Sequence, residues 1–109
     1  MQITRTRGDT APDSFTVTNA KTRAAVNLTG CSFKMTISTV PDPVDNTTQV
    51  YQVDGVINAP ATGIVEFSPT AAQANQVGYF YYDIQMTDSY GRILTLDKDV
   101  YLFTQDITK

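Results

Sequence analysis

The sequence predicts an all-β chain folded as a sandwich of about seven strands in two packed antiparallel sheets, with one short helical turn. Two observations predict this fold. Apolar and polar residues alternate with a period of two along most of the chain, which is typical of strands that bury one face. Clusters of Gly, Pro, Asn and Asp recur about every ten residues between these stretches, as they do in sandwiches and barrels.

The clearest predicted strand runs from Cys31 to Thr39, where apolar residues alternate with hydroxylated or charged ones. Shorter strands with the same alternation are predicted over 14–18 and 63–67. In the tyrosine-rich strand the even-numbered residues are the predicted core, and they are Phe80, Tyr82, Ile84 and Met86. The odd-numbered residues are predicted to face outward, and they are Tyr79, Tyr81, Asp83 and Gln85.

One stretch favours a helix. Residues 70–75, TAAQAN, follow the helix-start signal Ser68-Pro69 and precede Gly78, so we predict one helical turn there. Residues 41–48, PDPVDNTT, are predicted to form a mobile loop between two strands.

Length and charge limit the classes of function. With 109 residues, the chain is predicted to form a single domain, 1–109, around one core. Its 8 basic and 11 acidic residues give a net charge of −3, which offers no basic surface to a phosphate backbone, so no nucleic acid is expected as a partner. The apolar runs are far shorter than the roughly 18 residues of a membrane helix, so no membrane and no secretory route are expected.

Catalytic sites are disfavoured by the residue types that are missing. The sequence has no histidine, the usual base of serine and cysteine nucleophile systems and the commonest zinc ligand. Most acids are predicted to stabilise their own turns, namely Asp9, Asp13, Asp42, Asp45, Asp54, Asp88 and Asp97. Facing carboxylates for glycoside hydrolysis and calcium binding by the Asp-rich loops are weaker alternatives. We therefore expect no cofactor, no metal and no enzyme activity.

Tyrosine is the residue type that points most directly to a function, since six tyrosines are present and tryptophan is absent. Tyr79 and Tyr81 on an outer strand face could anchor a protein interface or stack on a sugar. Alternatively, cross-strand aromatic pairs simply stabilise a sheet face. The last strand is apolar on both faces, so one face is predicted to meet another chain, and Tyr101 and Phe103 are its interface candidates.

The tripeptide Arg7-Gly8-Asp9 matches the motif that some adhesion proteins present to integrins, but a turn is a sufficient explanation. Gly8 permits a backbone conformation that other residues avoid, and Asp9 can cap the turn. Arg5 and Arg7 are predicted to share the face of a short strand whose Ile3 points inward. They could pair with acids of a neighbouring subunit.

Four short motifs occur in order along nearly the whole chain. They are Arg7 to Thr10 in a turn, Leu28 to Gly30 before an alternating strand, Gly78 to Gln85 within a strand, and Asp106 to Thr108 at the close. Their order and spacing resemble the immunoglobulin-like domains of phage tail and baseplate proteins, in particular the N-terminal domain of phage baseplate upper proteins. The resemblance implies an immunoglobulin-like β-sandwich. The longer chains of that family carry a receptor-binding or branching portion with no counterpart here, so it implies a stand-alone adaptor or decoration subunit.

From this resemblance we expect a structural protein of the phage virion, a small adaptor or assembly subunit of the tail or baseplate that contacts other virion proteins. It is expected to be made in the cytoplasm of the host bacterium and to form a homo-oligomer or part of a symmetric assembly. Two alternatives stay open. One is a capsid decoration or cement protein, and the other is a carbohydrate-binding module for host attachment that uses Tyr79, Tyr81 and Tyr90.

Overall fold

The computed structural model describes residues 2–107, which form seven strands and two short 3-10 helices. The strands are β1 (Ile3–Thr6), β2 (Asp13–Thr16), β3 (Ser32–Ser38), β4 (Gln49–Asp54), β5 (Ile64–Phe67), β6 (Gly78–Thr87) and β7 (Ile93–Thr104). The 3-10 helices are η1 (Asn46–Thr48) and η2 (Pro60–Thr62). The predicted all-β class and strand number are therefore confirmed for the described residues.

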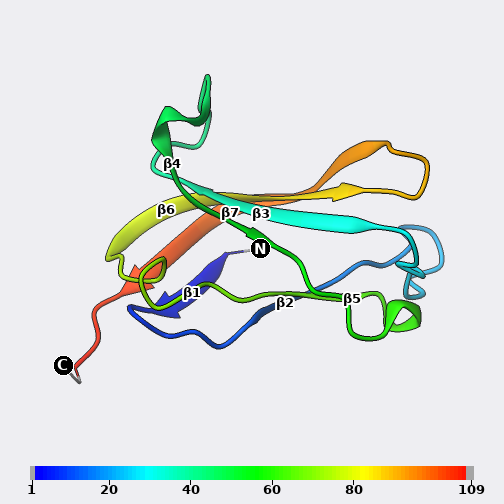
Figure 1. Cartoon of the computed structure of the whole chain (residues 1–109), viewed down its shortest axis with the longest axis horizontal. Helices are drawn as coiled ribbons and strands as arrows, with labels where there is room; N and C mark the ends of the chain where they lie inside the picture. Colours follow the sequence, from blue (N-terminus) through cyan, green and yellow to red (C-terminus); the bar gives the residue numbers. More distant parts are fainter. Residues whose placement is uncertain (1, 108–109) are drawn as a thin grey trace.

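The strands form two layers. Five strands make one sheet in the order β1-β7-β6-β3-β4, and β2 pairs with β5 in a second sheet that lies beneath β3 and β6 in Figure 1. One pairing differs from the prediction of antiparallel sheets: β1 runs parallel to β7, with Ile3 opposite Tyr101. Parallel pairing needs a long connection between the strands. Nearly the whole chain separates β1 from β7, so that condition is met.

The core lies between the two sheets, and the even-numbered face of β6 contributes to it as predicted. Tyr82 and Ile84 are buried, while Phe80 and Met86 are half-buried against the same cluster. The fully buried residues come from both layers, and the largest are Tyr101, Phe67, Phe103, Leu28, Met35, Ile37, Ile84 and Val65. Burying a side chain of this size stabilises the fold by about 1.5–3 kcal/mol.

Gly55 marks the point at which the chain leaves β4 and crosses to the smaller sheet. Its N–H donates to the carbonyl of Phe33 at 2.8 Å, and Val56 then forms a β-bridge with Glu66. A Cβ at position 55 would lie 2.5 Å from Cγ2 of Val65 and 2.8 Å from Cβ of Phe33. The absence of a side chain therefore allows the two layers to approach here.

The predicted helical turn over 70–75 is a single hydrogen-bonded turn. The N–H of Ala74 donates to the carbonyl of Thr70 at 2.9 Å and closes it. Thr70 and Gln73 cap it reciprocally, because the backbone N–H of each donates to the side-chain oxygen of the other. Residues 41–48 connect β3 to β4, as the sequence predicts, and end in η1. Neither 3-10 helix was predicted.

Candidate functional site

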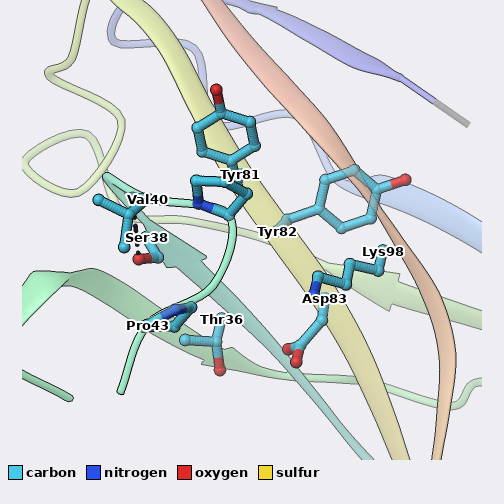
Figure 2. A pocket seen from close by; sticks show the side chains of 9 residues that line it. Thr36, Ser38, Val40, Pro43, Tyr81, Tyr82, Asp83 and Lys98 are labelled. Carbon is cyan, nitrogen blue, oxygen red and sulfur yellow. Dashed lines mark hydrogen bonds between the residues drawn. The ribbon is translucent and has the colours of Figure 1, made fainter. Parts of the chain in front are cut away.

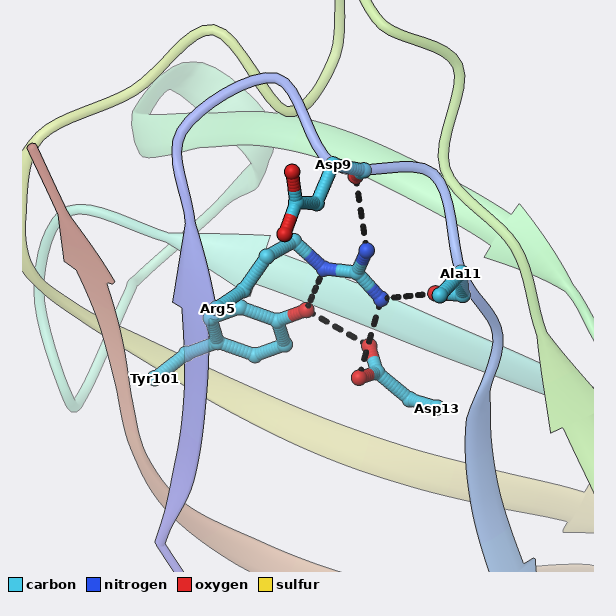
Figure 3. Close-up of polar contacts among 5 residues, drawn as sticks. All are labelled: Arg5, Asp9, Ala11, Asp13 and Tyr101. Atoms are coloured by element: carbon cyan, nitrogen blue, oxygen red, sulfur yellow. Dashed lines mark hydrogen bonds and ion pairs between the residues drawn. The ribbon is translucent and has the colours of Figure 1, made fainter. Parts of the chain in front are cut away.

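Arg5 is the centre of a buried polar cluster, although the sequence analysis proposed acids of a neighbouring subunit as its partners. Its Nε donates to the hydroxyl of Tyr101 at 2.7 Å, and Nη2 lies 2.9 Å from Oδ1 of Asp13. Its Nη1 and Nη2 also donate to the carbonyls of Asp9 and Ala11. The Tyr101 hydroxyl in turn donates to Oδ2 of Asp13 at 2.5 Å. Figure 3 shows the guanidinium enclosed by these four partners.

Electrostatics favour this arrangement. Burial alone would lower the pKa of Arg5, but the Tyr101 hydroxyl and the charge of Asp13 outweigh it, so this pKa lies above its usual value. Burial raises the pKa of Tyr101 well above its usual value, and the hydrogen bond to Asp13 raises it further. The cluster thus holds one cation, one carboxylate and one protonated phenol, and it joins β1 and β7 to β2 in the other sheet. Its role is structural.

The burial of three interface candidates argues against the interface role predicted for them. Arg5 is 6% exposed, Tyr101 0% and Phe103 1%. Tyr101 stacks on Phe103 with ring centroids 4.7 Å apart and an interplanar angle of 26°. The apolar pattern of β7 predicted a face that meets another chain, but one of its two apolar faces is covered by the smaller sheet. These three side chains are not available to a partner of the folded chain.

Arg7 lies just beyond β1, in the turn that contains the Arg-Gly-Asp motif. Its Nε is 2.9 Å from Oδ1 of Asp106, so its partner belongs to the same chain. Gly8 has a φ of +84°, the left-handed region that the sequence predicted for it, and its N–H donates to the carbonyl of Ala74. The motif is thus part of a turn tied to the C-terminal segment. Thr108, the last residue of the closing motif, lies outside the described residues.

Two interface candidates lie on the outer face of the five-stranded sheet, as predicted. Tyr79 is 69% exposed, and Tyr81 is half-buried. In the register of β6 and β7, Tyr79 is opposite Leu102 and Tyr81 is opposite Val100. The outward residues of β7 are therefore Val100 and Leu102, and both are half-buried. Together these four residues form an apolar strip on the surface.

A cleft adjoins this strip, which we call the Tyr81 cleft (Figure 2). It lies between the outer face of the sheet and the 41–48 loop, and has a volume of about 90 Å³. The loop is held over the sheet by Lys98, whose Nζ lies 3.2 Å from Oδ1 of Asp42. At the base of the loop, the hydroxyls of Ser38 and Thr48 are 3.0 Å apart. The cleft is lined by Thr36, Ser38, Val40, Pro41, Pro43, Tyr81, Tyr82, Asp83 and Lys98.

Asp83 brings a carboxylate to the Tyr81 cleft. It lies on β6 opposite Thr36 and Lys98, and it is half-buried. Burial raises its pKa, an effect that the charge of Lys98 partly offsets. Within residues 2–107 its carboxylate takes part in no hydrogen bond or ion pair, since Lys98 pairs with Asp42 instead. The cleft therefore combines apolar walls with one carboxylate free to accept hydrogen bonds.

Sequence reasoning missed two parts of this surface. Asp83 was placed on the outer face of its strand without a role, and the approach of the 41–48 loop to it depends on a contact distant in sequence. The apolar residues after the tip of the β6–β7 hairpin were also missed: Ile93 and Leu94 are 67% and 46% exposed, near Tyr90, which the carbohydrate alternative names and which is 84% exposed. Adjacent apolar residues at 93–94, soon after the Ser89-Tyr90-Gly91 turn, were the available signal.

The turn-acid prediction is confirmed at some positions and corrected at others. Asp45 accepts from the N–H of Thr47, and Asp88 accepts from those of Tyr90 and Arg92. Asp13 instead pairs with Arg5. Asp97 lies within β7 and accepts both from the adjacent N–H of Lys98 and from the Tyr82 hydroxyl at 2.6 Å.

Two kinds of feature were not found among residues 2–107. No three His, Cys, Asp or Glu side chains of this part lie together as a metal site would require. None of its helices has the length and apolar character needed to cross a membrane.

The comparisons with known proteins bear mainly on the fold. No protein-family model and no curated protein matches the sequence. Among solved structures, the chain is similar to the N-terminal domain of phage TP901-1 ORF48, with a TM-score of 0.54. The alignment covers 95% of this chain and 85% of that chain, at 9% sequence identity. Nearly the whole chain therefore has a structural counterpart in a phage protein domain.

Proposed function

We propose that this protein is a structural subunit of a phage virion, an adaptor or assembly component of the tail or baseplate that acts through protein–protein contacts. The observation that carries the proposal is the likeness of its fold, over 95% of the chain, to the N-terminal domain of a phage protein, TP901-1 ORF48. The order of motifs in the sequence supports the same setting independently.

The surface is suited to such contacts. The strip formed by Tyr79, Tyr81, Val100 and Leu102 and the hairpin tip at 90–94 both expose aromatic and aliphatic side chains. Aromatic residues are enriched in protein interfaces because they offer large contact areas at low entropic cost. The proposed partners are other virion proteins or further copies of this chain. No step of this function requires a reacting group or a cofactor.

Immunogold electron microscopy tests the location. An antibody to this protein is applied to particles purified from the source in which its gene is found, with pre-immune serum as the control. Label confined to the tail end is the expected result. Label over the shell would instead establish a capsid decoration protein, and particles without label would overturn the assignment to the virion.

A carbohydrate-binding module is the second candidate, favoured by one observation. Tyr79 is 69% exposed on the same sheet face as Tyr81 and the unpaired carboxylate of Asp83. Aromatic rings that stack on sugars beside groups that accept hydrogen bonds form such sites. Glycan-array binding that is lost in Tyr81→Ala would support this function. Absence of binding to any glycan would leave the structural role.

A further inference from the structure

Most of the basic side chains of this protein form ion pairs within the chain. Seven of the 8 basic residues lie within residues 2–107, and five of these form ion pairs with acids of the same chain. The other two are Lys21 and Arg23, which are exposed and have no side-chain partner in the described part of the chain. Both lie in the turn formed by residues 19–24, which we call the basic turn.

The basic turn has a defined backbone. Oδ1 of Asn19 accepts from the N–H groups of Lys21 and Thr22, and the carbonyl of Asn19 accepts from Arg23 at 2.7 Å. Arg23 has a φ of +59°, and among residues 2–107 it is the single non-glycine residue with positive φ. Such a conformation persists where surrounding contacts fix it. A fixed turn loses less conformational entropy on binding than a mobile one does.

Most acidic side chains of the described residues are likewise paired, and few are not. Within residues 2–107, Asp83 and Asp9 are the carboxylates whose side chains form no hydrogen bond or ion pair. Asp9 is exposed to solvent, which hydrates its charge, but Asp83 is half-buried in the Tyr81 cleft. A half-buried carboxylate without a partner carries a desolvation cost that a cation from outside would offset. Asp42 on the loop above it adds a second negative charge against the single charge of Lys98.

The basic turn and the Tyr81 cleft are therefore complementary in charge. No acidic residue occurs between positions 14 and 41, so nothing in the sequence neighbourhood of the turn neutralises it. In Figure 1 the segment that follows β2 lies at the right-hand end of the molecule, whereas the 41–48 loop projects upward from the left half. The basic turn and the Tyr81 cleft of one molecule therefore lie apart and do not contact each other.

We propose that the Tyr81 cleft of one molecule is the docking site for the basic turn of a second copy of this chain. The guanidinium of Arg23 reaches Asp83, its aliphatic stem lies against Tyr81 and Pro41, and Lys21 lies near Asp42. Because two different surfaces meet, the contact is heterologous, and it repeats either into a closed ring or into an open chain. This contact adds a mode of assembly to the proposed structural function. It rests on that function only for its biological setting.

Sedimentation velocity of the purified full chain tests the contact. We expect the weight-average mass to rise between about 5 µM and about 500 µM protein at low salt, and to fall when salt screens the charges. Arg23→Glu and Asp83→Lys should each weaken association by at least about tenfold. The control for Arg23→Glu is Lys34→Glu, and the control for Asp83→Lys is Asp54→Lys. Each control changes the net charge by the same amount as its variant, but at the Lys34–Asp54 pair on the outer sheet face. Asp83→Asn serves as a second cleft variant should Asp83→Lys fail to fold.

Mixing Arg23→Glu with Asp83→Asn gives the sharpest test. Arg23→Glu keeps an intact cleft and Asp83→Asn keeps an intact basic turn, and the two altered surfaces do not attract each other, so together they can form a single contact. We expect the equimolar mixture to form a dimer and nothing larger, while each variant alone stays monomeric. A wild-type protein that remains monomeric throughout, or variants that associate as well as their controls, would overturn the proposal. Tail-end label on virions together with a monomeric protein would overturn this contact and leave the structural function intact.

Discussion

Nη2 of Arg5 lies 2.9 Å from Oδ1 of Asp13, and this ion pair joins the two layers of the sandwich. Arg5 belongs to β1 of the larger sheet, and Asp13 opens β2 of the smaller one. The side chains are only 4% and 15% exposed, so water screens their attraction weakly. The first turn of the protein, which contains the Arg-Gly-Asp motif, is thereby fixed between the layers.

Replacing Arg5 by methionine is expected to destabilise the protein by about 3–5 kcal/mol. The substitution keeps an aliphatic stem but leaves the carboxylate of Asp13 buried without its cation, which costs more than the pair itself contributes. The free energy of unfolding, measured by urea denaturation, checks this prediction.

Arg7→Met is the matched control for Arg5→Met. Arg7 also forms an ion pair, but its side chain is 31% exposed and that of Asp106 is 22% exposed. Its loss should cost about 1 kcal/mol or less. Equal losses in the two variants would contradict a special role for the buried pair, and the double variant Arg5→Met/Asp13→Asn should recover part of the loss.

The protein is expected to lose stability in alkaline solution, beginning near pH 10. Burial raises the pKa of Tyr51 from 10 to about 12, and it raises the pKa values of Tyr82 and Tyr101 as well. A tyrosine whose pKa is higher in the folded state than in the unfolded state adds its full contribution to stability at pH values below the unfolded-state pKa. This contribution is lost as the pH rises from about 10 through the pKa of the folded state. Urea midpoints at increasing pH, with phenolate absorbance followed in parallel, measure the loss.

Tyr51→Phe isolates one contribution to the alkaline unfolding. The variant removes one titrating proton, so the free energy of unfolding should fall less steeply with pH, by up to about 1.4 kcal/mol per pH unit. A slope identical to that of the wild type between about pH 10 and 12 would show that Tyr51 does not titrate with unfolding.

The sequence could predict the faces of strands that alternate, and it failed where they do not. The even-numbered residues of β6 lie inward, because alternation defines one apolar face. In β7 both faces are apolar, so periodicity alone cannot tell which of Tyr101 and Leu102 is covered. The second sheet decides the matter by covering Tyr101, and no local pattern contains that information.

The burial of Arg5 was unpredictable for a related reason. A charged residue in a short N-terminal strand is normally exposed. Its partners are Asp13, eight residues later, and Tyr101, 96 residues later, so only the folded chain brings them together. The Tyr81 cleft likewise depends on the 41–48 loop approaching β6. Local pattern therefore predicted the candidates Tyr79 and Tyr81, and contacts distant in sequence formed the site around Tyr81.

Gly55→Ala is expected to destabilise the protein by about 1–3 kcal/mol. The added methyl group would lie 2.5 Å from Val65 and 2.8 Å from Phe33, and both neighbours belong to the packed core. Overpacking forces side chains and backbone to shift. Thermal unfolding measures the loss. Gly91→Ala differs in kind, because nothing lies within 4 Å of its Cβ and its cost would come from a φ of +83° alone.

Two of the aromatic interface candidates, Phe103 and Tyr79, are expected to respond oppositely to truncation. Phe103 is 1% exposed and contacts the rings of Tyr51, Phe80 and Tyr101, so Phe103→Ala should cost about 3–5 kcal/mol of folding free energy. Tyr79 is 69% exposed, so Tyr79→Ala should cost about 1 kcal/mol or less of folding free energy, even though the residue lies in a strand.

Urea denaturation measures both values, and incorporation of the tagged protein into virions gives a second readout. A stable Tyr79→Ala protein that is incorporated poorly would identify Tyr79 as a contact residue. Normal incorporation would remove it from the interface and leave the hairpin tip at 90–94 as the exposed apolar surface to test.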